Sequence, residues 1–330
     1  MRRHLIRRLL LLLPTLLGVM VLVFVMMRVA PGDVALAILA GPQGQGEIDE
    51  AAYQQLRHKL GIDKPVLIDP VDPARGSQFG DWIFGVLRGD WGESVQTERP
   101  VLQEIADRLP ITFELTVLAV AISLAIGIPA GMAMAVKQDT RIDYVIRVLS
   151  IGGLSMPSFW TATLILLVLV LVFRWLPPLG YRQLTRDPLG NLQQVIWAAL
   201  PLGYLLSAVI ARMTRSSLLD VLRNDYVRTA RAKGLRERLI LTRHALANAL
   251  LPVVTVSGLQ FAGLMGGTVV METIWNLPGL GTRLVAAIGF RDYPMVQGII
   301  LVFALIVLIT NFVVDLAYGW LDPRIRFGEG

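Results

Sequence analysis

Residues that could do chemistry are few and widely separated in this chain of 330 residues. Cysteine is absent, which excludes disulfides, thiolate metal sites and cysteine nucleophiles. The three histidines, His4, His58 and His244, lie in separate regions and offer little material for a metal site or for histidine catalysis. No G-x-x-x-x-G-K-[ST], H-E-x-x-H or G-x-S-x-G motif occurs. We therefore expect no catalytic residue, no metal site and no cofactor in this chain.

Three carboxylates stand in or beside apolar segments, namely Glu114, Glu272 and Asp315. An ionisable residue inside a membrane is costly and is often functional, for example in a proton relay. Each of these three lies within a few residues of an expected helix end, and none pairs with another at helical spacing. Placement at the membrane interface explains them better than a relay does.

The most informative stretch is basic and rich in alanine: NDYVRTARAKGLRERLILTRHALANALLP, from Asn224 to Pro252. Asp225 to Lys233 favour a helix, and Gly234 is well placed to end it in the left-handed conformation. Ala230, Ala232 and Gly234 leave a low surface that another protein could approach closely. Positive charges beside this surface could pair with acidic residues of that protein; they belong to Arg228, Arg231 and Lys233. The alternative is a basic helix that only sets membrane topology and contacts anionic lipids.

Composition places these residues in a membrane protein. Hydrophobic residues make up 54% of the chain and charged residues 17%, with a mean hydropathy of +0.59, whereas soluble domains carry about 25% charged residues. Met1 to Arg8 holds four arginines and no acid, and residues 212–247 hold nine Lys or Arg against three acids. Such segments stay cytoplasmic, so the net charge of +6 indicates topology and not nucleic-acid binding.

Six apolar segments are long enough to span a bilayer, which needs about 20 residues each. Their number puts both termini in the cytoplasm. A secretory signal peptide is the alternative for the first, but about 19 apolar residues exceed the usual 7–15 and no cleavage site follows. Arg174 to Gln193 disagrees with this topology, because it should be outside yet carries three Arg and one Asp. The expected spans are Leu9–Met27, Ile111–Val136, Val148–Phe173, Gln194–Ala211, Leu250–Met271 and Gln297–Trp320.

The chain therefore divides into an N-terminal membrane helix (1–28), an extracytoplasmic segment (29–110), a core membrane domain (111–320) and a cytoplasmic tail (321–330). Within the outer segment, Ile48, Ala52, Tyr53, Leu56 and Leu60 predict an amphipathic helix that ends at Gly61. Asp63 to Gly80 is rich in proline, which predicts a loop. A second short helix should start at Pro100, with Val101, Leu102, Ile105 and Leu109 on one face, and lie on the membrane surface.

Motifs spread over the whole chain resemble those of permeases in dipeptide and oligopeptide ABC importers, a family that includes nickel and glutathione systems. Six matches occur in family order, including SMPSFW (Ser155 to Trp160), DYVRTARAKGL in the basic stretch and METIWNLPGLGTRLVAAIGFRDYPMVQG (Met271 to Gly298). One departure is clear: the general importer loop reads Glu-Ala-Ala, but Arg228-Thr229-Ala230 stands there, as expected for the peptide subfamily. Asp63 to Gly80 also looks longer than the usual connection.

The resemblance implies a type I importer fold of six helices in the cytoplasmic membrane of a bacterium. It implies four kinds of partner: a homologous second permease, two ATPase subunits that bind ATP and Mg²⁺, an extracytoplasmic substrate-binding protein and membrane lipid. Residues 212–247 would be the coupling loop for the ATPase. Its docking residues would be Arg228, Thr229, Ala230, Arg231, Ala232, Lys233 and Gly234.

Short peptides are the first expectation for the substrate, with glutathione, nickel chelates or oligosaccharides as alternatives. The outer helices, Gly46 to Leu60 and Pro100 to Leu109, would form part of the dock for the binding protein. Two other classes remain open. A membrane-embedded enzyme would need polar residues that converge inside the bilayer, and the spans offer none that pair convincingly. A self-sufficient channel or secondary transporter would use helices interrupted at Pro129, Pro157 and Pro201 to build a site at the midplane.

Overall fold

The computed structural model describes residues 2–29, 35–36, 39, 49–59, 62–66, 76–178 and 180–321. Within these ranges every regular element is a helix, apart from one β-bridge between Glu93 and Pro100. The chain divides into two compact units. Unit 1 comprises Ile111–Gly279 and the chain from Ile306 onward, and unit 2 comprises Arg2–Pro110 and Leu280–Leu305. Most of the expected tail lies outside the described residues.

Four helices are long and apolar enough to cross a membrane, as the sequence predicts. They are α1 (Arg2–Val29), α5 (Val101–Val136), α8 (Pro188–Leu222) and α15 (Tyr293–Leu321). Two bent pairs also qualify when each is taken together: α6 (Arg141–Ser155) with α7 (Ser158–Leu171), and Glu237–Ala249 with α12 (Leu251–Gly267). With each bent pair counted as one span, the described part of the chain holds up to six candidate spans by length and composition, and the all-helical expectation is confirmed.

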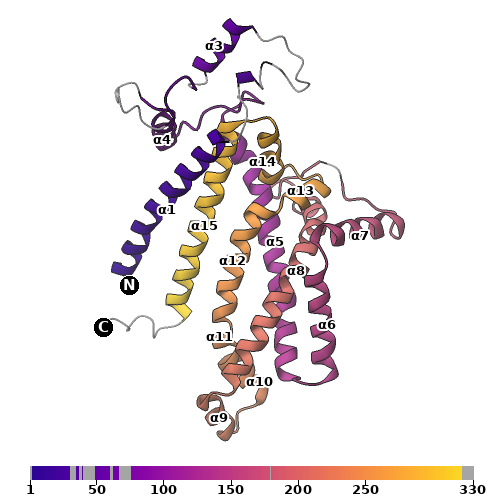
Figure 1. Cartoon of the computed structure of the whole chain (residues 1–330). Helices are drawn as coiled ribbons and strands as arrows, with labels where there is room; N and C mark the ends of the chain where they lie inside the picture. Colours follow the sequence, from indigo (N-terminus) through magenta and orange to yellow (C-terminus); the bar gives the residue numbers. More distant parts are fainter. Residues whose placement is uncertain are drawn as a thin grey trace. The chain divides into compact units, whose positions relative to one another are not determined.

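The third span differs from its prediction. Val148–Phe173 was expected as one helix, but α6 and α7 meet at an angle of 102°, and α7 turns sharply away from the axis of α6 (Figure 1). Pro157 is the cause, because its ring disfavours the helical conformation of the residue before it. Met156 is accordingly extended, with φ −93° and ψ 127°.

The fifth span is also bent. It starts as α10 (Glu237–Leu239), continues as the π-helix η2 (Ile240–Ala245) and α11 (Leu246–Ala249), and turns by 51° into α12. Pro252 lies in the first turn of α12, where its missing N–H costs little. Beyond Gly267 the chain forms a separate short helix, α13 (Val269–Ile274), so the predicted end at Met271 is wrong.

In unit 1, α5 and α8 approach so closely that glycine is required between them. A Cβ on Gly127 would lie 2.7 Å from Cβ of Ile210, and one on Gly131 would lie 2.5 Å from the carbonyl oxygen of Ala211. Glycines four residues apart let membrane helices come into backbone contact. We call this contact the glycine seam. Beside it lies the main core of unit 1, which includes Ile111, Leu115, Ala119, Ala162, Val195, Ala198, Ala199, Leu202, Leu264, Met271 and Leu277.

Unit 2 contains α1, α3 (Glu50–Lys59), α4 (Gln78–Arg88), α14 (Leu280–Gly289) and the first turns of α5 and α15. Aromatic rings join α1 to α4: the Phe24 ring lies 5.1 Å from that of Phe79 and 5.8 Å from that of Trp82. The core consists of Val101, Ile105, Leu280, Ala287, Met295, Val296 and Ile299.

The predicted amphipathic helix of the outer segment is confirmed as α3, although Ile48, Leu60 and Gly61 lie outside the described residues. The predicted loop over Asp63 to Gly80 is wrong at its end, because α4 begins at Gln78. Ser77 caps α4 by accepting the Gly80 amide hydrogen at 3.0 Å, and Gly89 ends it at φ +84°.

The predicted short surface helix at Pro100 does not exist as a separate element. Its residues are the first turns of α5, which continues without a break through Pro110. Val101 and Ile105 are buried in the core of unit 2, whereas Leu102 is exposed. The burial pattern therefore belongs to a helix packed inside the protein.

Candidate functional site

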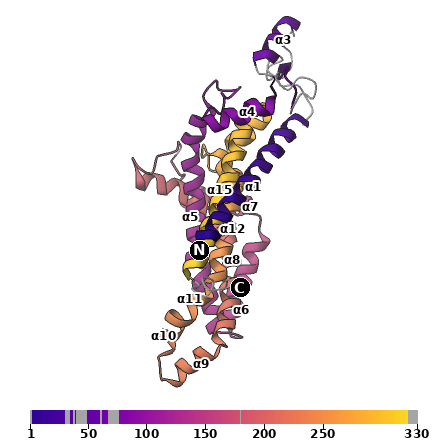
Figure 2. The same cartoon turned by 90° about the vertical axis from the view of Figure 1, so that its left-hand side faces the viewer.

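The predicted docking residues lie on α9 (Asp225–Ala232) and the turn that ends it. Both views place α9 and α10 beyond the end of α8, at one extremity of unit 1 (Figure 1, Figure 2). A two-residue turn joins α8 to α9, since α8 ends at Leu222 and Asp225 opens α9. A very short connection thus joins α9 to a long membrane helix.

One face of α9 holds it against the rest of unit 1. Val227 is completely buried, and α9 packs against η2 and the end of α8. Beside it, the Tyr226 hydroxyl accepts a hydrogen bond of 2.9 Å from Nδ2 of Asn248 on α11. A buried anchor and this hydrogen bond to α11 therefore fix one side of α9.

The end of α9 has the geometry that the sequence predicts. Gly234 has φ +76°, in the left-handed region. Its N–H donates to the carbonyl of Arg231 at 2.9 Å, and the N–H of Leu235 donates to the carbonyl of Ala230 at 3.3 Å. These are the two hydrogen bonds of a Schellman motif. A Cβ on Gly234 would meet no atom within 4 Å, so only the backbone conformation selects glycine here.

The outer surface of α9 is basic and open. Of the seven predicted residues, Ala230 is half-buried and the other six are exposed. Arg228 lies 3.5 Å from the Asp225 carboxylate. Arg231 binds Glu237 of α10 through two hydrogen bonds of 2.7 and 3.2 Å, and this carboxylate raises the pKa of Arg231. The Thr229 hydroxyl donates to the carbonyl of Asp225 at 3.0 Å.

The three apolar-segment carboxylates have different surroundings. Glu272 is fully buried and accepts hydrogen bonds of 2.8 Å from the hydroxyls of Thr112 and Thr268, so its carboxyl group lies inside the protein, and its expected depth in the membrane stays a prediction. A Cβ on Gly279 would overlap its carboxyl group. Asp315 is half-buried on α15.

Glu114 is half-buried and accepts hydrogen bonds from the Tyr181 hydroxyl at 2.7 Å and from Nδ2 of Asn191 at 3.0 Å. Burial, followed by the neighbouring carboxylate, raises the pKa of Tyr181. Neutral donors thus hydrogen-bond to this carboxylate, and the Asn191 contact joins α5 to the start of α8.

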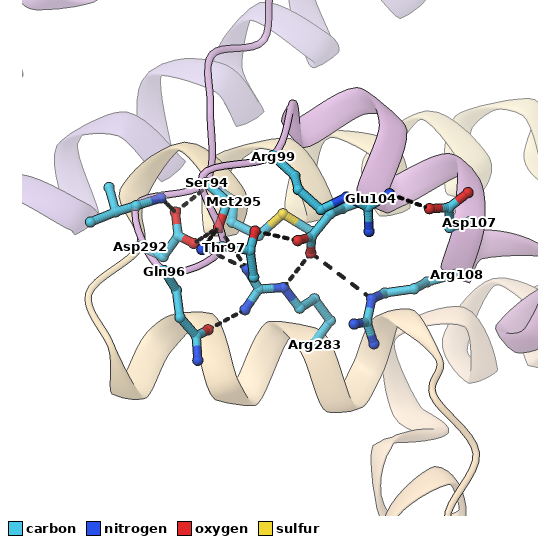
Figure 3. Close-up of polar contacts among 11 residues, drawn as sticks. Ser94, Gln96, Thr97, Arg99, Glu104, Asp107, Arg108, Arg283, Asp292 and Met295 are labelled. Atoms are coloured by element: carbon cyan, nitrogen blue, oxygen red, sulfur yellow. Dashed lines mark hydrogen bonds and ion pairs between the residues drawn. The ribbon is translucent and has the colours of Figure 1, made fainter. Parts of the chain in front are cut away.

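A buried ion cluster in unit 2 was not predicted (Figure 3). Arg283 of α14 is only 4% exposed and donates through Nε to Glu104 at 2.6 Å. Its Nη2 donates to the hydroxyl of Ser94 at 2.8 Å and to Asp292 at 3.2 Å. Glu104 and Asp292 are themselves buried, at 1% and 0% exposure. One guanidinium therefore bridges two buried carboxylates.

Further donors complete the cluster. Glu104 also accepts from the Thr97 hydroxyl and lies 3.9 Å from Arg108. Asp292 accepts from the Ser94 hydroxyl at 2.5 Å and from the Val95 amide at 3.1 Å. The cluster holds residues 94–97, the first turn of α5, α14 and the loop before α15 in one arrangement. Within the described residues, no group of three or more His, Asp or Glu side chains could hold a metal ion.

A second unpredicted ion pair ties α6 to α8. Asp143 is fully buried near the start of α6 and binds Arg147 at 2.8 Å and Arg215 of α8 at 3.1 Å. Higher along α6, the Tyr204 hydroxyl of α8 donates to the carbonyl of Leu149 at 2.7 Å. These contacts tie α6 to α8, the helix that leads into α9.

Comparison with known proteins places this architecture in a family. Residues 127–327 match the model of the binding-protein-dependent transport system inner membrane component, and residues 1–116 match the model of the corresponding N-terminal region. The chain is 41% identical to the glutathione transport system permease protein of Pectobacterium atrosepticum, over 99% of this chain and 100% of the relative. It is 37% identical, over the same shares, to the dipeptide transport system permease protein of Alkalihalophilus pseudofirmus.

Among solved structures, a chain of the MetNI methionine ABC transporter in an inward-facing conformation shares the fold, with a TM-score of 0.54 at 18% identity. The match covers 67% of this chain and 97% of that one. These similarities and the apolar helices establish a multi-pass protein of the cytoplasmic membrane with a transport role and not an enzymatic one. The chain belongs to the family of binding-protein-dependent transport system inner membrane components.

Proposed function

We propose that this chain is one permease subunit of an ATP-driven importer of short peptides. It pairs with a homologous second permease, and the substrate path runs between the two. Two ATPase subunits bind ATP and Mg²⁺ on the cytoplasmic side, and a binding protein delivers substrate from outside. The observation that supports this best is α9: an exposed basic helix, anchored by Val227 and ended by left-handed Gly234.

The contacts of α9 suggest how the docked ATPase drives transport. ATP closes the ATPase dimer and carries α9 with it. Since α9 packs against η2 and α8, its displacement passes to both elements. Rigid-body rocking of the permease then exposes the path to one side of the membrane and then to the other.

The proposed substrate class rests on the relatives. Their names specify a dipeptide in one case and glutathione, itself a tripeptide, in another. Short peptides are the class that includes both, and nickel chelates and oligosaccharides rank behind them. We expect the binding protein to select among peptides. The outer segment, including α3, would contribute to its dock, and unchanged uptake after deletion of residues 47–60 would remove that role.

Cross-linking tests the docking surface directly, because the chain has no cysteine of its own. Ala232→Cys places one thiol on the exposed end of α9. Gln138→Cys is the control, since residue 138 is exposed in the turn between α5 and α6, which the predicted topology puts on the same side of the membrane. With a short thiol-reactive cross-linker in native membranes, we expect Ala232→Cys to capture an ATP-binding subunit and Gln138→Cys to capture none.

Equal capture at both positions, or none at Ala232→Cys, would refute the docking surface. A tagged pull-down then identifies the remaining subunits by mass spectrometry. Recovery of the chain alone, together with substrate flux in liposomes that hold only this chain, would instead establish a self-sufficient transporter.

A further inference from the structure

The outward segment from Arg174 to Gln193 carries a positive charge that the topology leaves unexplained. We propose that this segment binds an anionic phospholipid, with an acyl chain in the pocket between α7 and α8 and the phosphate on Arg174. This lipid site is independent of the ATPase dock and of the transported substrate.

The pocket has the size and lining for an acyl chain. Its volume is about 640 Å³, within the range of pockets that enclose ligands of drug size. The Trp175 and Trp197 rings lie 5.8 Å apart within it, and tryptophan is enriched where membrane meets water. The lining residues are Leu169, Phe173, Trp175, Leu189, Leu192, Gln193, Ile196 and Trp197.

The rim of the pocket favours lipid over water. Phe173 is 67% exposed and Leu189 is 76% exposed. Both belong to the ends of apolar membrane elements, since α7 ends at Leu171 and α8 begins at Pro188. Apolar side chains at this exposure need a cover, and the hydrocarbon of the surrounding bilayer is the apolar medium in which α7 and α8 lie.

Arg174 supplies the second observation. It has φ +50°, a left-handed conformation that glycine or asparagine would adopt at lower cost. This conformation closes the end of α7, where the Trp175 amide donates to the carbonyl of Leu169 at 3.0 Å. Arg174 stands between two pocket-lining residues, Phe173 and Trp175, and neighbouring Cα atoms are about 3.8 Å apart, so its backbone lies at the edge of the pocket. A charged side chain therefore occupies a strained left-handed position beside the pocket.

The charges of the segment select an anionic headgroup. Arg182 is paired with Asp187 at 2.6 Å. Arg174 and Arg186 therefore carry the net positive charge. A guanidinium forms charge-assisted hydrogen bonds with phosphate oxygens, and the additional positive charge favours a headgroup without a cation of its own, such as phosphatidylglycerol.

Quantification of the lipid that stays with the purified transporter tests the proposal. The complex is extracted in mild detergent, and its retained phospholipids are measured by mass spectrometry against the composition of the parent membrane. We expect phosphatidylglycerol to be enriched over phosphatidylethanolamine. Arg174→Gly should lower its retention by about tenfold, the loss expected for one charge-assisted contact, and should relieve the backbone. Arg174→Lys should preserve most of it.

Two further variants separate the parts of the site. Arg291→Gly is the matched control, because Arg291 is also left-handed, at φ +55°, and lies outside the pocket; it should change nothing. Trp197→Ala should reduce retention whatever the headgroup, because it removes a wall of the pocket. Equal lipid retention by Arg174→Gly and the unaltered protein would overturn the proposal. So would an intact complex that retains no phospholipid at all, because the pocket would then be shown not to hold one. The readout needs no transport, so failure of the peptide-importer assignment would leave it interpretable.

Discussion

Replacing Arg283 with methionine should destabilise unit 2 far more than any exposed charge change. Methionine keeps an unbranched apolar stem but removes the guanidinium hydrogen bonds to Glu104 and Asp292, which are 1% and 0% exposed. Breaking a buried ion pair from one side costs about 3–5 kcal/mol. Arg108 and the neutral donors around both carboxylates remain, so we place the cost near the lower end, at about 3 kcal/mol.

Hydrogen exchange of backbone amides is the suitable assay, because it measures local opening without a two-state transition of the whole chain. A loss of about 3 kcal/mol corresponds to roughly a hundredfold faster exchange in α14. Arg99→Met is the matched control. Arg99 also pairs with an aspartate, Asp107, at 2.8 Å, but the side chains are 47% and 57% exposed. Its loss should cost at most about 1 kcal/mol.

The two variants together decide the matter. Arg283→Lys should fall between them, because an ammonium restores charge without the planar fork that reaches both carboxylates. If Arg283→Met and Arg99→Met changed exchange in α14 equally, burial would not govern the strength of this cluster, and the reasoning would be refuted.

Three other changes have outcomes that the structure specifies. Gly131→Ala should lower the free energy of unfolding by about 1–3 kcal/mol through overpacking. Gly152→Ala should not, because its Cβ would meet no atom within 4 Å. Thermal aggregation of the two solubilised variants compares their stability, and equal midpoints would contradict the close contact of α5 and α8 at the glycine seam. Gly234→Val should leave the protein in the membrane but abolish uptake, because a β-branched residue resists the left-handed end of α9 by about 1–2 kcal/mol; normal uptake would reject the proposed dock. The pKa of Asp187 lies below its ordinary 3.8, because Asp187 accepts the amide hydrogen of Gly190 and pairs with an arginine. Because the pKa of Asp187 is lower in the folded than in the unfolded protein, its carboxylate stabilises the folded state above the unfolded-state pKa of about 3.8. This stability is lost as the pH falls through the folded-state pKa, so amides in the first turn of α8 should lose protection from exchange below about pH 3.8. Asp187→Asn should remove this pH dependence, and a dependence that persists would assign it to another group.

The sequence predicted the elements whose signals are local. The length of each apolar segment located the spans, since a bilayer requires about 20 residues whatever the partner helix. At α9, a helix-forming run followed by Gly234 contained all the information that its Schellman end needs. The observed φ of +76° follows from the one residue type that adopts it without steric cost.

The ion cluster and the glycine seam could not be predicted in the same way. Arg283 and Glu104 are 179 positions apart, and no periodicity relates them. Gly131 is required by the backbone of Ala211, which only the packed helices bring near. The bend at Pro157 and the helix after Ser77 had local signals, a proline within a span and a capping serine, but hydropathy and proline content outweighed them in the prediction.

The glycine seam has a mechanical consequence for transport. Where two helices meet through side chains, they can slide as rotamers change, but Gly127 and Gly131 place the backbone of α5 directly against α8. Backbone atoms have no alternative rotamers, so α5 and α8 should move together as one rigid body. A displacement applied at the α9 end of α8 should therefore move α5 by a similar amount. Unit 1 should then flex at its two bends, which are 102° between α6 and α7 and 51° before α12.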